Sequence, residues 1–450
     1  MAYQWQRPAP QAFRPWSRGI AVVFAVSLFV LVPTTALDPD NPARDVVPIA
    51  AVLVLLAAWF TRRDTLARVD LALLAALLVC WGLFIDPEIR AEVTGMAVRI
   101  ALLVAVVLVA GTTNASERLL VARSVVVLAM VQLLIVPVEL LLLPEPLYGS
   151  PAAIGSFGEV LPELVPANAL FGDAISRAQG TLGHPLPLAL LAWSGMVLVL
   201  VNAVKRPIHE RAVAFGVLAA VLVFSGSRSA ILGAFAVTIV VVGARWRQRR
   251  PSISPFAFKT ALAALVCAGL VVIGTAHSQV AALLDSGSWT HRVGAFGSIE
   301  SLLNRPWREV LVGGGFGSSS DYYERGMLQT DGLRAVDNMY VLLLAEAGLL
   351  GVASVLLLFA WALLRGDLLN RSLVVVVAGM SIVLDTLAWQ SSMIVFAVAV
   401  AFGQHSRTLT AKGPMEASGP AADLDPRKRA TVNGGALDVP GLPARSPEAH

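Results

Sequence analysis

The sequence predicts an all-α polytopic membrane protein with about twelve transmembrane helices and both termini on the cytoplasmic side. The first observation is composition. Hydrophobic residues make up 56% of the chain and charged residues only 14%, whereas about a quarter of a soluble domain is charged. The second is that long apolar runs alternate with short polar connections. The third is that these connections alternate between basic and acidic along the chain.

A helix needs about 20 apolar residues to cross a bilayer, so runs near 15 are short or tilted by the packing of their neighbours. The apolar runs lie at 19–37, 46–60, 69–85, 96–112, 119–143, 184–204, 211–224, 229–244, 259–276, 338–364, 372–386 and 388–404. The chain therefore divides into an N-terminal tail (1–18), nine spans (19–276), a large outer loop (277–337), three spans (338–404) and a C-terminal tail (405–450). The mixed Ala, Pro, Gly and charged composition of the last segment predicts disorder.

The charges of the connections predict which side of the membrane each one occupies. Basic connections are typical of the cytoplasmic side. The basic connections are TRRDTLAR (61–68), KRPIHER (205–211), RWRQRR (245–250) and RGDLLNR (365–371), and the acidic ones include DPDNPARD (38–45) and DPEIRAE (86–92). One missed or extra helix would break this alternation. The large loop is thereby predicted on the outer face.

Several classes of site have no signal in the sequence. Cys80 and Cys267 both lie inside apolar runs, so neither a disulfide framework nor a cysteine metal site is indicated. The six histidines show no metal-ligand spacing. The net charge of +4 comes from arginines beside apolar runs, which is a topology signal and not a nucleic-acid footprint. We therefore expect no metal, no cofactor and no nucleic acid.

Four arginines are predicted to converge on the outer face: Arg99, Arg177, Arg228 and Arg292. Arg99 lies just inside the fourth span, and Arg228 lies in the tight hairpin SGSRSA (225–230). An arginine at membrane depth is costly and usually faces a partner or a polar cavity; snorkelling to the lipid headgroups is the alternative. Guanidinium groups bind phosphate oxygens in pairs. Several arginines without a metal motif predict a bound diphosphate.

Asp337 stands one residue before an apolar run, in the segment VDNMY (336–340). Two interpretations remain open. Asp337 is either the N-cap of the following helix or a general base that faces the arginines. Glu346, two turns deeper, is either part of a buried structural pair or a catalytic group.

The remaining candidates for binding substrate also lie at the predicted outer face. His184 and His291 are weaker base candidates, because each more often bonds a loop backbone. The further candidates are Trp307, Arg308, Asn338 and Tyr340. The run GGGFGSSS (313–320) lacks the Lys-Ser/Thr of a phosphate-binding P-loop, so we predict the flexible backbone of a lid.

Three segments carry a resemblance to a known family. FSGSRSAILG (224–233), GTLGHPLPLA (180–189) and LVGGGFGSSS…VDNMYVLLLAEAGLLG (311–351) resemble the O-antigen ligase and polymerase superfamily of bacterial envelope glycosyltransferases. The resemblance covers residues 175–364. It implies transfer of a glycan from a polyprenyl-diphosphate donor to a hydroxyl of a glycan or glycolipid acceptor. The reaction would run on the outer face of the bacterial cytoplasmic membrane, without a metal or nucleotide.

The motif match places the donor-diphosphate arginines of that family at Arg228 and Arg292. The ligase branch usually has a histidine where this chain has Asp337, which is compatible with polymerases or with ligases of other glycans. A single displacement would invert the anomeric carbon. The competing interpretation is a transporter or flippase of an anionic or lipid-linked envelope precursor, which shares the twelve-span layout. The charges cluster at the outer edge and there is no internal repeat, which favours the transferase.

Overall fold

The computed structural model describes residues 17–34, 37, 41–60, 90–143, 147–148, 167–168, 171–249, 287–329 and 336–402. The predicted spans 69–85 and 259–276 and the predicted disordered tail lie outside these residues. So do Cys80 and Cys267.

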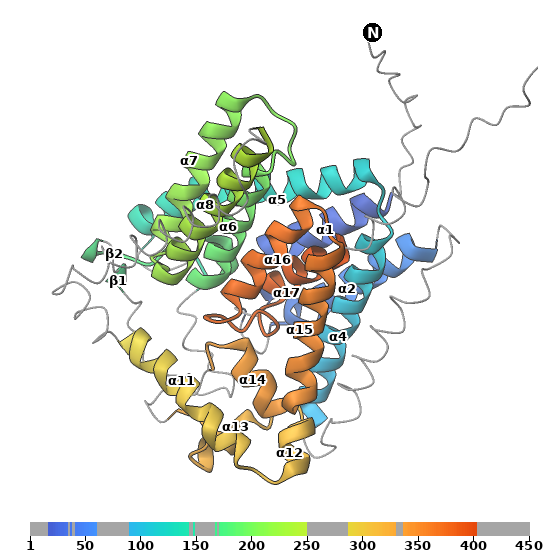
Figure 1. The fold of residues 1–450 in the computed structure, drawn as a ribbon, viewed down its shortest axis with the longest axis vertical. Helices are drawn as coiled ribbons and strands as arrows, with labels where there is room; N and C mark the ends of the chain where they lie inside the picture. The colour runs from blue at the N-terminus through green and yellow to red at the C-terminus, as the bar shows by residue number, and fades with distance from the viewer. Residues whose placement is uncertain are drawn as a thin grey trace, which may run out of the picture. The chain divides into compact units, whose positions relative to one another are not determined.

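The described chain is mainly helical, as predicted (Figure 1). Its first half contains α1 (Arg18–Leu31), α2 (Ala43–Phe60), α4 (Arg90–Gly111), α5 (Ala115–Leu142), η3 (Gly180–Leu182), α6 (Pro185–Leu200), α7 (Ile208–Phe224) and α8 (Arg228–Arg249). Its second half contains α11 (Gly287–Leu303), α12 (Trp307–Val312), α13 (Ser319–Glu324), α14 (Met339–Glu346), α15 (Gly348–Arg365), α16 (Leu368–Met380) and α17 (Gln390–Ala401). A short antiparallel hairpin, β1 (Ala167–Asn168) with β2 (Gly172–Ser176), is the one departure from the all-α prediction among these residues.

Two helices form the centre of the packing. Helix α6 is apolar on every side and buried from Pro185 to Val199, and it packs against α5, α7, α8, α16 and α17. Helix α17 is buried along its whole length and contacts α1, α4, α15 and α16. A helix that is hydrophobic all round is one that other helices surround. These two helices therefore fix the ends of the neighbours that carry the candidate site.

Two of the described helices, α5 and α15, are long and apolar enough to cross a membrane. Only 33% of the apolar window of each is buried inside the protein. Leu134 and Leu141 of α5 are 73% and 76% exposed, and Leu364 of α15 is 78% exposed. A helix of a soluble core would bury these side chains. Exposed leucine on a long helix is the pattern of a lipid-facing surface.

The predicted span 338–364 is two helices. Helix α14 ends at Glu346, and α15 begins at Gly348, whose φ is +62°. A residue with a side chain disfavours this left-handed conformation. A Cβ at Gly348 would also lie 2.4 Å from the carbonyl carbon of Leu311. The apolar pattern runs through the break, so periodicity does not reveal it.

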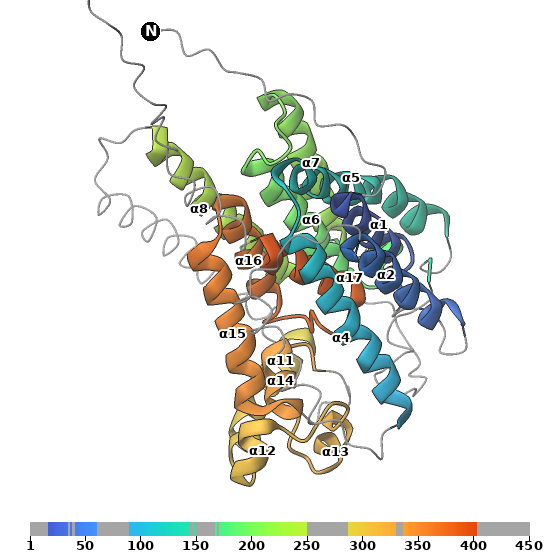
Figure 2. The same cartoon turned by 90° about the vertical axis from the view of Figure 1, so that its right-hand side faces the viewer.

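The outer loop and α14 form an ordered unit with its own apolar core (Figure 2). Helix α14 contacts α11, α12 and α13. The core side chains are Leu302, Tyr322, Leu328, Val336, Val341, Leu344 and Ala345. The segment described in sequence as a loop is thus a small helical subdomain.

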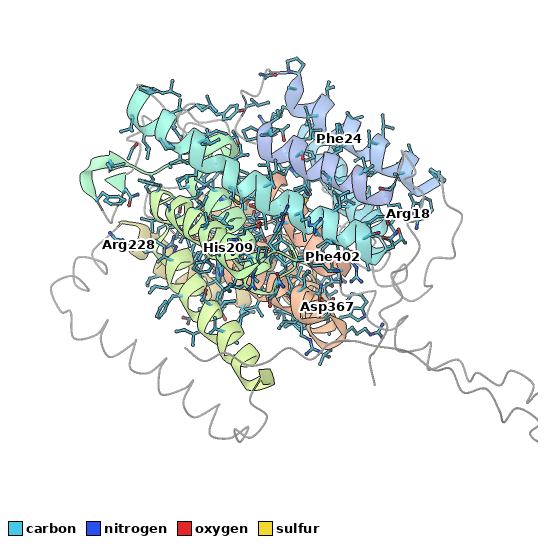
Figure 3. The ribbon with its side chains drawn as sticks, turned by 90° about the horizontal axis from the view of Figure 1, so that it is seen from above. Arg18, Phe24, His209, Arg228, Asp367 and Phe402 are labelled. Carbon is cyan, nitrogen blue, oxygen red and sulfur yellow. The ribbon has the colours of Figure 1, made fainter. Side chains whose placement is uncertain are left out.

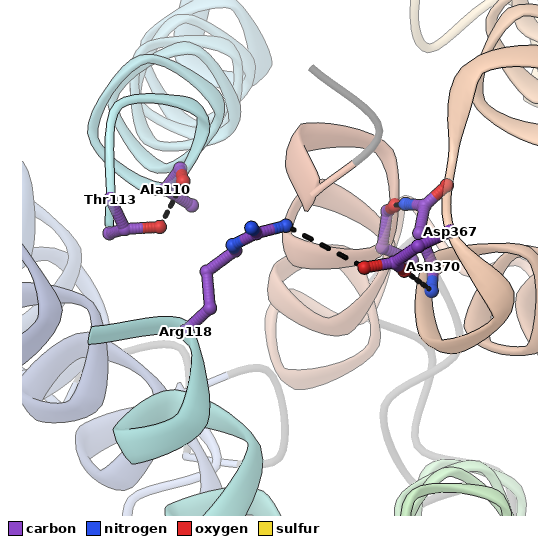
Figure 4. Close-up of polar contacts among 6 residues, drawn as sticks. Ala110, Thr113, Arg118, Asp367 and Asn370 are labelled. Carbon is purple, nitrogen blue, oxygen red and sulfur yellow. Dashed lines mark hydrogen bonds and ion pairs between the residues drawn. The ribbon is translucent and has the colours of Figure 1, made fainter. Parts of the chain in front are cut away.

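Several contacts link the connections between different helices. In each case the two linked connections are ones that the sequence predicts on the same side of the membrane. At one end, Arg18 donates to the Thr112 carbonyl at 3.4 Å, and Arg118 lies 3.9 Å from Asp367 (Figure 4). At the other end, Arg177 donates to the Ser225 carbonyl. Arg228 lies on the opposite side of the bundle from Arg18 and Asp367 (Figure 3). These contacts lie at different places on the bundle, and the predicted topology, including which end faces the cytoplasm, stays a prediction.

Candidate active site

The hairpin between α7 and α8 is locked to the chain that precedes η3. The Arg177 Nε donates to the Ser225 carbonyl at 3.1 Å, and the Ala178 amide donates to the Phe224 carbonyl at 3.0 Å. Gly226 has φ +65°, and a Cβ there would lie 3.0 Å from the Arg177 side chain. The turn therefore requires glycine twice over, for its conformation and for its close packing. Arg228 begins α8 two residues later, beside Arg177.

Arg177, Arg228, Arg292 and Asp337 form one electrostatic group, called here the arginine cluster. Burial lowers the pKa of Arg177 to about 10; the nearby charges of Arg292 and Arg228 lower this pKa too, and Asp337 raises it. Burial also lowers the pKa of Arg292, with Asp337 opposing and Arg228 adding to the effect. Arginine side chains keep their positive charge in proteins. Three positive charges and one negative charge leave +2, which attracts an anion.

Polar groups without partners surround this cluster. Arg292 Nε, Ser227 Oγ and Ser229 Oγ are buried and make no hydrogen bond within the described residues. Leaving such a group unsatisfied costs about 1–3 kcal/mol. An anion with several oxygens would satisfy these donors. The cluster therefore combines positive charge with unused hydrogen-bond donors.

Asp337 is not the N-cap of α14. The cap is Asn338, whose side-chain oxygen accepts from the Tyr340 and Val341 amides at 3.0 and 3.1 Å. The capping interpretation of Asp337 was wrong because the helix begins one residue later than the apolar pattern indicates. The half-buried Asp337 carboxylate instead acts on the charges of Arg177 and Arg292. This leaves the general-base interpretation.

Asp385 is a buried carboxylate near the cluster that the sequence analysis missed. It is 8% exposed, and its Oδ1 accepts from the Leu387 and Ala388 amides at 3.0 and 3.2 Å. The charges of Arg99 and Asp337 both act on it. Arg99 thus reaches the site through Asp385. An aspartate inside an apolar run indicates a functional site in a membrane protein. The sequence shows such an aspartate, Asp385, within SIVLDTLAW (381–389).

The segment that holds Asp385 is fastened to the start of α14. The Met339 amide donates to the Ser381 carbonyl at 3.0 Å, and the Tyr340 hydroxyl donates to the Ala378 carbonyl at 3.0 Å. The predicted span 372–386 accordingly stops being helical at Met380. Tyr340 has a structural hydrogen bond here, and nothing in the described contacts brings it to the arginines.

The two candidate histidines differ in their surroundings. His184 is the N-cap of α6: its Nδ1 accepts from the Leu186 amide at 3.2 Å, and its ring lies 4.8 Å from that of Trp389. The charge of Arg177 acts on it. His291 is 3% exposed and precedes Arg292 on α11. Since the His184 nitrogen already accepts a backbone amide, His184 is a weak candidate for a base.

Trp307 and Arg308 do not join the cluster. Trp307 is 68% exposed on α12, and the Arg308 guanidinium lies 5.7 Å from the centre of its ring. This is a surface stack of two neighbouring residues. Their sequence positions predict that Trp307 and Arg308 lie in the outer loop. The sequence does not show that both side chains lie on the exposed face of α12.

The backbone of the glycine run is hydrogen-bonded to the end of α14, and its expected role as a lid stays a prediction. The Gly314 and Gly315 amides donate to the Ala345 and Glu346 carbonyls at 3.0 and 2.9 Å. The Glu346 carboxylate accepts from the Gly317 amide at 3.2 Å and the Ser319 hydroxyl at 3.1 Å. Glu346 is therefore a structural group. The run holds α14 from its C-terminal end, and so fixes the direction in which Asp337 enters the cluster.

The Arg305 side chain completes this attachment. Its guanidinium donates to the Leu344 and Ala345 carbonyls at 2.8 and 3.1 Å and lies 4.6 Å from the centre of the Tyr322 ring. These carbonyls are at the C-terminal end of α14, where a cation is favourable. Among the described residues, no group of three His, Cys, Asp or Glu side chains could hold a metal ion.

The fold and the site together describe a helical protein, compatible with an all-α membrane protein, that gathers arginines at one end of its bundle. Residues 213–356 match the family described as O-Antigen ligase. The match covers about a third of the chain and supports its similarity to the O-antigen ligase-like superfamily. No curated protein matches the chain. The matched region contains Arg228, Arg292 and Asp337, and its activity is, in general terms, glycosyl transfer of the ligase or polymerase type.

Proposed function

We propose that this chain transfers a glycan from a polyprenyl-diphosphate donor to a hydroxyl of a glycan or glycolipid acceptor, on the outer face of the bacterial cytoplasmic membrane. The observation that carries the proposal is the arginine cluster: three guanidiniums and one carboxylate in a single electrostatic group. The diphosphate is the only part of such a donor that carries a concentrated negative charge. The match to the O-antigen ligase family supports the choice of donor.

The arginines hold the diphosphate and stabilise it as it leaves. When the bond between the anomeric carbon and the phosphate oxygen breaks, its electron pair stays on the diphosphate. Donors already aimed at that developing charge lower the barrier without reorganising. The buried Nε of Arg292 makes no hydrogen bond with the described residues, and the planar groups of Arg228 and Arg292 suit phosphate oxygens. Arg177 is held by Ser225 through Nε, which leaves its terminal nitrogens for the same anion.

Asp337 receives the proton. The acceptor oxygen attacks the anomeric carbon from the face opposite the diphosphate, and its hydroxyl proton passes to the Asp337 carboxylate. One displacement of this kind inverts the anomeric configuration. Nearby positive charges favour the charged form of a carboxylate, which is the form that can accept a proton as the hydroxyl becomes acidic during attack. Asp385 and Arg99 lie behind Asp337 and support its position.

The test is an assay of the purified full-length protein with a polyprenyl-diphosphate-linked glycan and an acceptor. We expect free polyprenyl diphosphate and glycosylated acceptor to appear in equal amounts. Release of polyprenyl diphosphate that does not depend on acceptor would indicate hydrolysis and contradict transfer. Movement of intact donor across a vesicle membrane without cleavage would establish the transporter interpretation in its place.

A further inference from the structure

Gln179 is buried with neither atom of its amide satisfied. It is 1% exposed, and both Oε1 and Nε2 lack a hydrogen-bond partner within the described residues. The great majority of buried side-chain polar atoms in proteins have a partner. A side chain that lacks both a donor and an acceptor partner is an exception that calls for a physical reason.

The backbone on either side of this amide is held rigidly. The Glu139 carboxylate accepts from the Gln179 amide N–H at 3.2 and 3.1 Å and from the Gly180 N–H at 2.7 Å. Gly180 has φ +57°, and a Cβ there would lie 2.4 Å from the Gln132 side-chain oxygen. The turn that carries Gln179 therefore cannot swing to find the missing partners.

A second buried glutamine, Gln132 of α5, contacts the same turn and shows the contrast. Gln132 is 0% exposed; its Nε2 donates to the Thr181 hydroxyl at 2.8 Å, and its Oε1 accepts from the Thr181 amide at 3.0 Å. Both of its groups are used. The same residue type, equally buried at the same turn, is satisfied in Gln132 and not in Gln179.

The place of Gln179 relative to the arginine cluster indicates the ligand. One residue, Ala178, separates it from Arg177, so the Cα atoms of Gln179 and Arg177 are at most about 7 Å apart, which is roughly the width of a sugar ring. An amide offers one acceptor and two donor hydrogens. A phosphate at neutral pH offers mainly acceptors, whereas a sugar hydroxyl or an acetamido group offers both a donor and an acceptor.

We propose that the Gln179 side chain binds the first sugar of the donor, at a hydroxyl or acetamido group beside the diphosphate that Arg177 holds. This inference rests on the proposed function. The donor sugar is favoured over the acceptor because it is bonded directly to the diphosphate. The amide is covered by its neighbours, so the donor displaces part of this cover when it binds. Gln179 thereby distinguishes a sugar-bearing donor from the bare lipid diphosphate product.

The test compares the binding of two lipids to the full-length protein: polyprenyl diphosphate and the same lipid bearing its glycan. We expect Gln179→Leu to weaken binding of the glycan-bearing lipid by about tenfold, the scale of one or two hydrogen bonds, and to leave binding of the bare lipid unchanged. Arg177→Lys should weaken both. Equal binding of the glycan-bearing lipid by Gln179→Leu and the wild type overturns the proposal, and so does a loss seen only in the KM for acceptor.

A stability measurement separates this role from a structural one. Leucine is close to glutamine in size and removes two unsatisfied atoms, so Gln179→Leu should unfold at the wild-type temperature or above it. The matched control, Gln132→Leu, removes an amide with both groups bonded and should unfold at a lower temperature. If Gln179→Leu is destabilised as much as Gln132→Leu, the amide has a structural partner and the proposal is wrong. If the wild type binds neither lipid, the proposed function fails as well; if it binds both and Gln179→Leu does not discriminate, only the sugar contact fails.

Discussion

The arginines at the two ends of the helical bundle have different surroundings. At the predicted cytoplasmic end, Arg118 lies 3.9 Å from Asp367, and Arg123 donates to the Val204 carbonyl at 3.2 Å. Each of these arginines faces an oxygen of another segment. At the predicted outer end, the charge of Arg228 acts on Arg292, and Asp337 opposes it at both Arg292 and Arg177.

This difference teaches how to separate structural arginines from functional ones in an apolar chain. An arginine that meets a carbonyl or a carboxylate ties two connections together and needs nothing more. Several arginines that face each other raise the energy of the folded protein, since like charges repel. The proposed diphosphate would relieve this repulsion, because it is an anion.

The largest expected effect concerns the sides of the membrane and is all-or-none. An epitope tag inserted after Gly326 should be accessible from outside intact cells, whereas one at Arg206 should become accessible only after the membrane is opened. Gly326 has open space around it and Arg206 is a highly exposed side chain, so neither insertion disturbs packing. Labelling of the Gly326 tag only in opened cells would reverse the two ends and refute the outer-face mechanism.

The next effect is on catalysis by the outer arginines. Arg228→Lys and Arg292→Lys each keep the charge but lose the planar fork, and we expect transfer to fall by about 10²–10³. Release of polyprenyl diphosphate by the purified variants measures this. Arg118→Lys at the other end is the matched control and should transfer glycan at the wild-type rate. Wild-type activity in both outer variants would show that the cluster does not bind the diphosphate.

The third effect separates the base from the cap. Asp337→Asn removes the proton acceptor and should slow transfer at least about tenfold, with an unchanged free energy of unfolding because Asn338 caps α14. Asn338→Ala should lose about 1 kcal/mol of stability. Asp337→His should recover part of the rate, which should rise through about pH 6.5 as imidazole becomes neutral. Full transfer by Asp337→Asn at every pH would remove this residue from the mechanism and direct attention to His291.

The smallest effect is expected at the cytoplasmic end. Asp367→Asn keeps an oxygen that can accept the Asn370 amide, as the cap of α16 does now, and loses only the ion pair with Arg118. Asp367 is 48% exposed, so the pair contributes about 0–1 kcal/mol. Chemical unfolding should show a change within this range, with no change in transfer. A loss of transfer would mean that Asp367 influences the arginine cluster at the other end of the bundle. This would contradict a purely structural role for the Arg118–Asp367 pair.

The positions of many helices could be predicted from the sequence. The length of an apolar run and the charge of a connection are local properties, so each can be read from a short segment. Helices α1, α2, α5, α6 and α7 lie where apolar runs predicted them. The convergence of Arg177, Arg228 and Arg292 also followed from topology, since it requires only that their connections share a side. The twelve-span count and its orientation remain predictions.

The features that the sequence did not reveal depend on distant partners. The break before Gly348 is hidden in an unbroken apolar run, because its cause is the backbone of Leu311. The backbone hydrogen bonds of the glycine run depend on carbonyls of Ala345 and Glu346, about thirty residues away. Asp385 was overlooked because an apolar window averages out a single charge. In each case the deciding contact was made by another segment, which no local pattern records.

The close contact between the glycine run and the α14–α15 junction also sets an order of assembly. Gly313 can pack against Glu346, where a Cβ would lie 2.2 Å from the carbonyl carbon, only after that residue has been synthesised. Gly313 and Gly348 are 35 positions apart, which takes about 2–7 s of chain elongation. During this interval α11, α12 and α13 have no α14 to pack on. The Arg292-bearing unit therefore closes late in biogenesis, and a chain that stops short of Gly348 has the arginines of the site but not the attachment that brings Asp337 to them.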